Sequence, residues 1–314
     1  MNKKRVMSLE EKLPSVPEAI YLFRSCTGTL QYPGVENAIR HICGLMGIEV
    51  IMDPDQTCCS GYLLTCSAYL PEFSLAVTAR NHALAEKRNL DIYTFCNGCY
   101  AYNCEFAHLL EDQKTRDTAN QLIGRFGYNY QGRAKVYHVQ ELYYRLKDRI
   151  AEKMVYPLKG LRVAAHYGCH YLLQEGVIDD FDLPTFHEEI LQALGATPVY
   201  YTERRACCGY GVGKVFTHKE EVVLPHLLNK LSSIRDEGAQ LITTVCPGCN
   251  VAMDREQPHL SQMGRGEFQI PVIDLGQLIA LSLGASPVKL GFNANTIKLD
   301  GILEYLGIDK GAQV

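Results

Sequence analysis

At 314 residues, the chain is long enough to form two domains of ordinary size or one large domain. Hydrophobic residues make up 47% and charged residues 21%, which is typical of a globular protein and excludes global disorder. The net charge of -4, without any dense run of lysine and arginine, gives no basis for nucleic-acid binding.

The N-terminal residues 1–19 contain acidic side chains where a signal peptide needs an apolar stretch. No run of about eighteen apolar residues, as a membrane span requires, follows. We therefore expect a cytoplasmic protein. Thirteen cysteines in that reducing compartment argue against a disulfide framework, and their odd number and clustering favour metal or redox chemistry.

The first half of the chain predicts four strands alternating with helices. An apolar, β-rich run occupies 18–26, and 36–51 combines an amphipathic helix with a short strand. A third apolar run, 90–99, ends in a C-x-x-C motif, and 134–142 predicts a further strand with a helix after it. Alternation of this kind favours a parallel sheet covered by helices.

The second half repeats this order. The segments 161–169, 187–201, 239–249 and 268–278 correspond in turn to the four segments of the first half. We therefore predict an α/β protein with two pseudo-symmetric Rossmann-like halves, each a parallel sheet flanked by helices. The predicted divisions are a first domain at 18–146, a linker at 147–160, a second domain at 161–285 and a C-terminal extension at 286–314.

Ten of the thirteen cysteines form two sets of five with the same order: a single cysteine, an adjacent pair, then a C-x-x-C. The first set is Cys26, Cys58, Cys59, Cys96 and Cys99, and the second set is Cys169, Cys207, Cys208, Cys246 and Cys249. All ten lie at or after the carboxyl ends of predicted strands, where open α/β sheets bind ligands. Each half therefore predicts one site.

The number of cysteines favours a multi-iron cluster over a single zinc ion. A structural zinc ion takes four ligands, and each half offers five. Neighbouring residues of an extended backbone point to opposite faces, which suits a multi-iron cluster held at two of its irons better than one small ion. Cys43, Cys66 and Cys104 fall outside the pattern, and Cys43 is expected in the core.

The pattern C-x(31)-C-C-S-G…C-N-G-C, repeated as C-x(37)-C-C-G…C-P-G-C, resembles the cysteine-rich CCG domain. Two copies without any further domain resemble the B subunits of heterodisulfide reductases, over nearly the whole chain from about Tyr21. The resemblance implies two non-cubane [4Fe–4S] clusters, one on each set of five cysteines. The first copy reads CCSG where the second reads CCGYG, so zinc stays the alternative for the first site.

The resemblance also implies a reaction and partners. The mixed disulfide of coenzyme M and coenzyme B would be reduced to the two thiols. Electrons would come from the iron–sulfur C protein of such an enzyme, supplied by its flavin-containing A protein, with a hydrogenase or formate dehydrogenase in the larger complex. No ferredoxin-type C-x-x-C-x-x-C-x-x-x-C motif occurs, so electrons must enter from a partner. The alternatives are a related reductase acting on a quinone or another disulfide, and a non-catalytic electron relay or zinc-bearing scaffold.

Several residues outside the two sets are candidates for handling this substrate. His170, directly after Cys169, is the predicted proton donor, because imidazole titrates near neutral pH; His166 is the weaker candidate. The other interpretation of His170 is packing or a hydrogen bond to a cluster sulfide. Arg204, Arg205 and Lys214 are predicted to bind the anionic ends of the substrate. Their alternative role is that of solvated charges, or of charges that offset the cluster.

Overall fold

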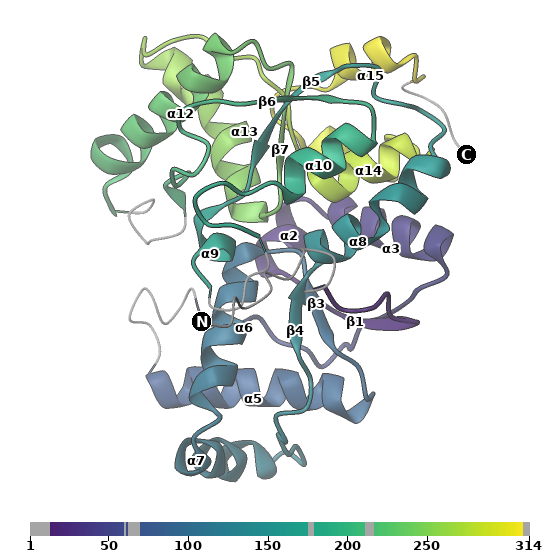
Figure 1. Cartoon of the computed structure of the whole chain (residues 1–314). Helices are drawn as coiled ribbons and strands as arrows, with labels where there is room; N and C mark the ends of the chain where they lie inside the picture. The colour runs from purple at the N-terminus through teal and green to yellow at the C-terminus, as the bar shows by residue number, and fades with distance from the viewer. Residues whose placement is uncertain (1–12, 60, 62–69, 175–178, 211–216, 310–314) are drawn as a thin grey trace, which may run out of the picture.

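The computed structural model describes residues 13–59, 61, 70–174, 179–210 and 217–309. The molecule has two halves, and each half consists of a four-stranded parallel sheet flanked by helices (Figure 1). Their strand orders are β2-β1-β3-β4 and β6-β5-β7-β8. The predicted pair of similar halves with parallel sheets is therefore confirmed. Within the described ranges, no helix combines the length and apolar character needed to cross a membrane.

The first sheet is built around β1, which is paired on both sides and almost completely buried. Its strands are β1 (Ala19–Phe23), β2 (Glu49–Ile51), β3 (Ile92–Thr94) and β4 (Val136–His138). The helices of this half are α2 (Cys26–Gln31), α3 (Gly34–Met46), α5 (Pro71–Lys87), α6 (Asn97–Leu109), α7 (Gln113–Gly124) and α8 (Val139–Glu152).

The second sheet repeats this strand order, with β5 and β7 as its two inner strands. Strand β7 is buried along its whole length. Its strands are β5 (Arg162–His166), β6 (Thr197–Val199), β7 (Leu241–Thr244) and β8 (Val272–Asp274). The α-helices are α9 (Cys169–Leu172), α10 (Phe186–Ala193), α12 (Leu224–Asp236), α13 (Pro247–Gln262), α14 (Leu275–Ser282) and α15 (Asp300–Leu306). A π-helix, η2 (Lys219–Val223), and a short 3₁₀ helix, η3 (Phe292–Ala294), complete this half.

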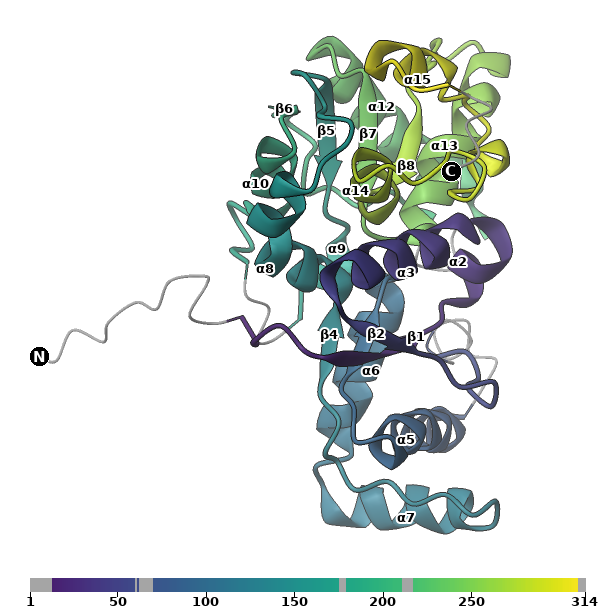
Figure 2. The same ribbon diagram turned by 90° about the vertical axis from the view of Figure 1, so that its right-hand side faces the viewer.

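The two halves pack through equivalent helices. The helix after the last strand of each half contacts the first long helix of the other, so α14 lies against α3 and α8 against α10 (Figure 2). The short helices next to the single cysteines follow the same rule, because α2 contacts α13 and α9 contacts α6. Buried side chains of both sheets, such as Leu22 and Val163, belong to one continuous hydrophobic core. The duplication in the sequence therefore produces a pseudo-two-fold molecule.

Hydrogen bonds between side chains and backbone hold the C-terminal segment against the rest of the molecule. Helix α8 continues to Glu152, inside the segment predicted as the linker, so the domain boundaries stay a prediction. The C-terminal segment packs back onto the body, since the buried Asp254 carboxylate accepts hydrogen bonds from the backbone N–H groups of Thr296 and Ile297 at 2.8 and 3.0 Å. Asn37 of the first half donates to the carbonyl of Lys289 at 2.8 Å.

Candidate metal centre

The cysteines follow the strands in the same way in both halves. Cys26 and Cys169 begin the short helices after β1 and β5. Cys96 and Cys246 are the N-cap residues of α6 and α13, directly after β3 and β7. Because β1 pairs with β3 and β5 with β7, the single cysteine and the C-x-x-C of each half lie at neighbouring strand ends. This is the place where the strand order reverses and open sheets bind ligands.

Both sets of cysteines open onto one cavity of about 170 Å³ between the halves. Nine of the ten predicted ligands line it; Cys58 does not, and its side chain is exposed. The polar residues that share this lining are Ser25, Thr27, Asn97, Tyr102, His170 and Tyr210. The cavity therefore brings all five cysteines of the second set together, and four of the first.

The thiols of the second set lie close enough to share one bound group. The Sγ atoms of Cys169 and Cys207 are 3.7 Å apart, and those of Cys208 and Cys249 are 3.3 Å apart. The backbone N–H of Gly209 donates to the Cys207 sulfur at 3.3 Å. Backbone donors of this kind stabilise thiolates and tune iron–sulfur potentials.

The two sets also touch each other. The side chains of Cys96 and Cys246 are joined by a hydrogen bond, although they belong to different halves. Hydrogen bonds from Cys249 and Cys96 hold the pKa of Cys246 well below its usual value, and the backbone N–H of Asn97 adds to this effect. The two candidate centres are therefore direct neighbours across the boundary between the halves.

The protonation of these thiols fits a cationic group. A hydrogen bond from the Cys169 thiol, with a further one from Cys208, lowers the pKa of Cys207 far below its usual value. The same contact with Cys207 raises the pKa of Cys169. Hydrogen bonds from neighbouring thiols therefore favour a thiolate at Cys207, and thiolates are the ligands of iron–sulfur clusters. An all-sulfur donor set is what iron–sulfur clusters use.

Asn97 and Gly168 hold the halves together at the edge of the cavity. The Asn97 side-chain amide donates to the carbonyl of Tyr167 in the other half at 2.6 Å. Gly168 has a φ of 76°, and a Cβ there would lie 2.3 Å from the Asn97 Nδ2 and 3.5 Å from the Cys249 sulfur. Only glycine lets the chain pass this close to both centres.

His170 lies at the wall of the cavity. It lines the cavity from α9, and its Nδ1 lies 3.7 Å from the Cys169 sulfur. Its ring centroid is 6.3 Å from that of Tyr102, on α6 of the other half. The sequence patterns do not single out Tyr102 or Asn97. For Tyr102 the available signal is its spacing, three residues after Cys99 on one helix face.

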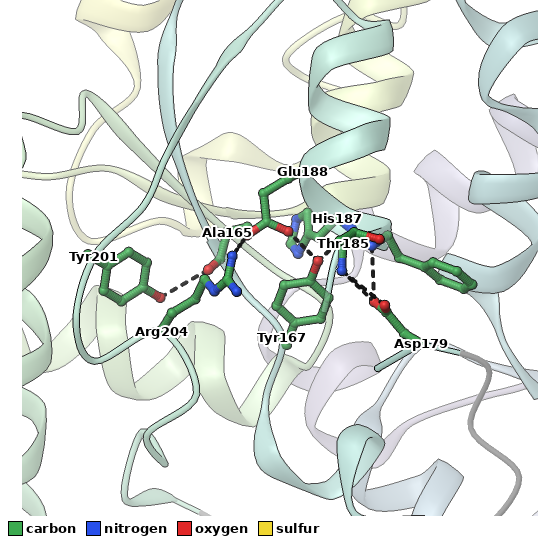
Figure 3. A network of polar contacts seen from close by, with 9 residues as sticks. Ala165, Tyr167, Asp179, Thr185, His187, Glu188, Tyr201 and Arg204 are labelled. Atoms are coloured by element: carbon green, nitrogen blue, oxygen red, sulfur yellow. Dashed lines mark hydrogen bonds and ion pairs between the residues drawn. The ribbon is translucent and has the colours of Figure 1, made fainter. Parts of the chain in front are cut away.

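The two arginines lie away from the cavity lining. The Arg204 Nη1 forms a 2.8 Å ion pair with the Glu188 carboxylate, which is buried and also accepts a hydrogen bond from the Tyr167 hydroxyl (Figure 3). The Arg205 guanidinium pairs with Asp182 on the surface at 2.7 Å. Lys214 lies outside the described residues. A substrate-binding role for these three residues stays a prediction.

His166 lies on the inner side of the second set. It is the last residue of β5 and 1% exposed, and one of its ring nitrogens is within 4.8 Å of the Cys208 and Cys249 sulfurs. Burial, together with the nearby Lys230 ammonium, lowers its pKa well below the usual value. A proton donor needs access to its acceptor, and His166 is not among the residues that line the cavity.

Comparison with known proteins assigns the class. The cysteine-rich domain family (CCG) matches residues 20–102 and 163–254, one copy in each half. The chain belongs to this family of cysteine-rich domain proteins. A solved structure of a hypothetical protein from Helicobacter pylori has the same fold, with a TM-score of 0.69 at 15% identity over 91% of this chain. The match spans about half of that longer protein, 53% of its length.

Two curated relatives are similar over most of their length. The B subunit of the Ferredoxin/F(420)H(2)-dependent CoB-CoM heterodisulfide reductase of Methanosarcina acetivorans is 33% identical over 282 residues, which are 88% of this chain and 93% of the relative. The 8-methylmenaquinol:fumarate reductase membrane anchor subunit of Wolinella succinogenes is 28% identical over 264 residues, 83% of this chain and 91% of the relative. Both names describe subunits of oxidoreductases, which together with the clustered thiols supports an iron–sulfur redox protein.

Proposed function

We propose that the protein is the catalytic iron–sulfur subunit of a heterodisulfide reductase, which reduces the coenzyme M–coenzyme B disulfide to its two thiols. The observation that carries the proposal is the single cavity lined by cysteines of both sets. A disulfide has two sulfur atoms and takes up two electrons and two protons on reduction. A cavity with one thiol set on each side offers each sulfur atom its own electron source.

The ten cysteines would hold two non-cubane [4Fe–4S] clusters, with zinc in the first half as the alternative. When bound, such clusters supply single electrons at potentials that the surrounding hydrogen bonds adjust. The remaining work falls to this chain. His170 holds a proton at the cavity wall and delivers it to one of the two product thiolates, and the other thiolate takes its proton from solvent on release. Tyr102 and Tyr210 orient the substrate in the cavity.

Electrons must come from outside the chain. The related heterodisulfide reductase protein is by its name one component of a larger enzyme, which supports assembly with partners. We assign electron donation to the iron–sulfur C protein of such an enzyme and the flavin to its A protein, with a hydrogenase or formate dehydrogenase in the larger complex.

The test uses the complex purified without oxygen. Iron and acid-labile sulfide should both be present, and the complex should oxidise a reduced viologen when given the coenzyme M–coenzyme B disulfide. Replacing His170 with alanine should lower turnover by about 10²–10⁴-fold while iron is retained. His108→Ala, an exposed histidine at the end of α6, is the control. A protein containing zinc alone, or full turnover of His170→Ala, would contradict these roles.

A second candidate function is reduction or oxidation of a quinone. The similarity to the Wolinella succinogenes protein favours it, because that protein is named for a methylmenaquinol reaction. The same purified complex decides between the two candidates. Turnover with a menaquinone analogue and none with the coenzyme disulfide would replace the first proposal with the second.

A further inference from the structure

Neither ring nitrogen of the buried His166 has a hydrogen-bond partner in the described part of the chain. Leaving such a buried group unsatisfied is unfavourable, because it loses its hydrogen bonds to water without replacing them. Unpaired buried polar groups are rare in native proteins, and a bound group at the site is one way in which they are satisfied.

The surroundings of His166 indicate what that bound group is. The nearest ligating atoms are the Cys208 and Cys249 sulfurs, within 4.8 Å. The other charged or titratable groups that face the ring are Lys230, Cys246, Cys207 and His187. The imidazole therefore lies at the end of β5, next to the second set of cysteines and outside the lining of the cavity.

The first half has no hydrogen-bond donor at the equivalent position. Phe23 ends β1 and precedes Cys26 by three residues, as His166 ends β5 and precedes Cys169. The Phe23 ring is fully buried in one apolar cluster with Cys59 and Cys99, the counterparts of Cys208 and Cys249. The same place therefore holds a phenyl ring behind one centre and an imidazole behind the other.

Lys230 is a second difference between the halves, and it also adds a hydrogen-bond donor with positive charge to the second half. It is fully buried on α12, donates to the carbonyl of Glu203 and lies 5.4 Å from the centroid of the Tyr201 ring. The offset of 149 residues that relates Cys59 to Cys208 pairs Lys230 with Asn81. The side chain of Asn81 is neutral, and its amide group forms hydrogen bonds with the backbone of Thr57 and Cys58.

Hydrogen bonds to the sulfurs and positive charge nearby raise the potential of an iron–sulfur cluster. We propose that His166 donates an N–H hydrogen bond to the iron–sulfur group held by the second set, and gives the second centre the higher reduction potential of the two. This inference rests on the proposed function, because it needs a cluster on each set. An electron delivered by the partner protein then resides first on the second centre, beside His170.

The wild-type protein gives the first test. A redox titration followed by electron paramagnetic resonance should show one centre reduced before the other. In the half-reduced protein, electron–nuclear double resonance should detect an exchangeable proton that disappears in D₂O. With ¹⁵N-labelled histidine, a weak nitrogen coupling should accompany that proton. No exchangeable proton coupling would overturn the proposal, and a strong nitrogen coupling would overturn it by making His166 an iron ligand.

Matched variants assign the effect to this position. His166→Phe copies the first half and should move the potential of the first-reduced centre downward, without changing the other centre or the iron content. His166→Gln, which keeps an N–H donor, should restore part of the shift. Phe23→His is the reciprocal change and should raise the potential of the other centre. Equal potentials in wild type and His166→Phe, at full iron content, would overturn the proposal.

Iron and sulfide analysis separates the two ways of failing. If wild-type protein contains no iron–sulfur group, the proposed function fails and this inference fails with it. If both clusters are present but His166→Phe changes neither the exchangeable proton coupling nor the potential, the inference alone is wrong. If His166→Phe loses iron, the resonance measurements on wild type still decide between a hydrogen-bond donor and a ligand.

Discussion

At the scale of single residues, two neighbouring arginines near the candidate centre form ion pairs that differ in burial. The Arg204 guanidinium forms a largely buried pair with Glu188, and the Tyr167 hydroxyl donates to the other oxygen of that carboxylate. Arg205, one position later, forms an exposed pair with Asp182. Neighbouring residues of the same type therefore have different energetic roles, because burial removes the screening that water gives to the second pair.

This difference predicts the effect of removing each arginine. Arg204→Ala leaves the Glu188 carboxylate buried without its cation, so unfolding free energy should fall by about 3–5 kcal/mol. Arg205→Ala should cost about 0–1 kcal/mol, since exposed pairs contribute little. Anaerobic urea denaturation measures both. Equal stability of the two variants, with a raised KM for the disulfide in Arg204→Ala, would instead assign Arg204 to substrate binding.

At the scale of elements, the turn between a strand and a short helix positions each single cysteine. Helix α9 begins at Cys169 directly after Gly168, whose backbone conformation favours glycine. The Asn97 amide, from the first turn of α6 in the other half, donates to the carbonyl before this glycine. One turn therefore places a ligand and joins the two halves.

Gly168→Ala should disturb both functions of this turn. A positive φ in a non-glycine residue costs on the order of 1–3 kcal/mol, and the new Cβ would also displace the Asn97 amide. We expect lower stability and less iron per chain. Gly44→Ala, on α3 where a Cβ meets no atom within 4 Å, should be neutral or slightly stabilising. Normal iron content and stability in Gly168→Ala would show that the turn tolerates a side chain.

The sequence predicted these elements well and their contacts poorly, for a physical reason. Strand and helix patterns are local, and the repeated cysteine order placed both sets at the strand ends. The hydrogen bond between Cys96 and Cys246 depends on how the two halves pack against each other, which no local sequence pattern records. The pairing of Arg204 with Glu188 was missed because a basic residue beside a cysteine gives no sign of a buried carboxylate sixteen residues away.

At the scale of the whole molecule, the halves meet through buried polar groups as well as apolar helices. Tyr32 of the first half donates to Asp254 of the second at 3.0 Å. Tyr171 of the second half donates to Glu141 of the first at 3.2 Å. Tyr32 directly follows α2 and Asp254 lies on α13, whereas Tyr171 lies on α9 and Glu141 on α8. The interface that forms the cavity is therefore sensitive to the charge on its buried carboxyl groups.

Glu141 makes that sensitivity measurable as a function of pH. Burial raises its pKa from 4.5 to about 8, so the folded protein keeps a proton that the unfolded chain has released. Because the folded state then binds more protons, unfolding free energy should fall as pH rises from about 4.5 to about 8. In Glu141→Gln this contribution is absent, and the variant should gain stability relative to wild type across that window. The difference between the two removes the parallel titration of Asp274, whose pKa burial raises to about 7.

Glu152→Gln, an exposed change on the same helix, should follow wild type at every pH. Denaturant titrations at a series of pH values, at constant iron content, give the comparison, and parallel curves for wild type and Glu141→Gln would contradict a neutral Glu141 at the interface.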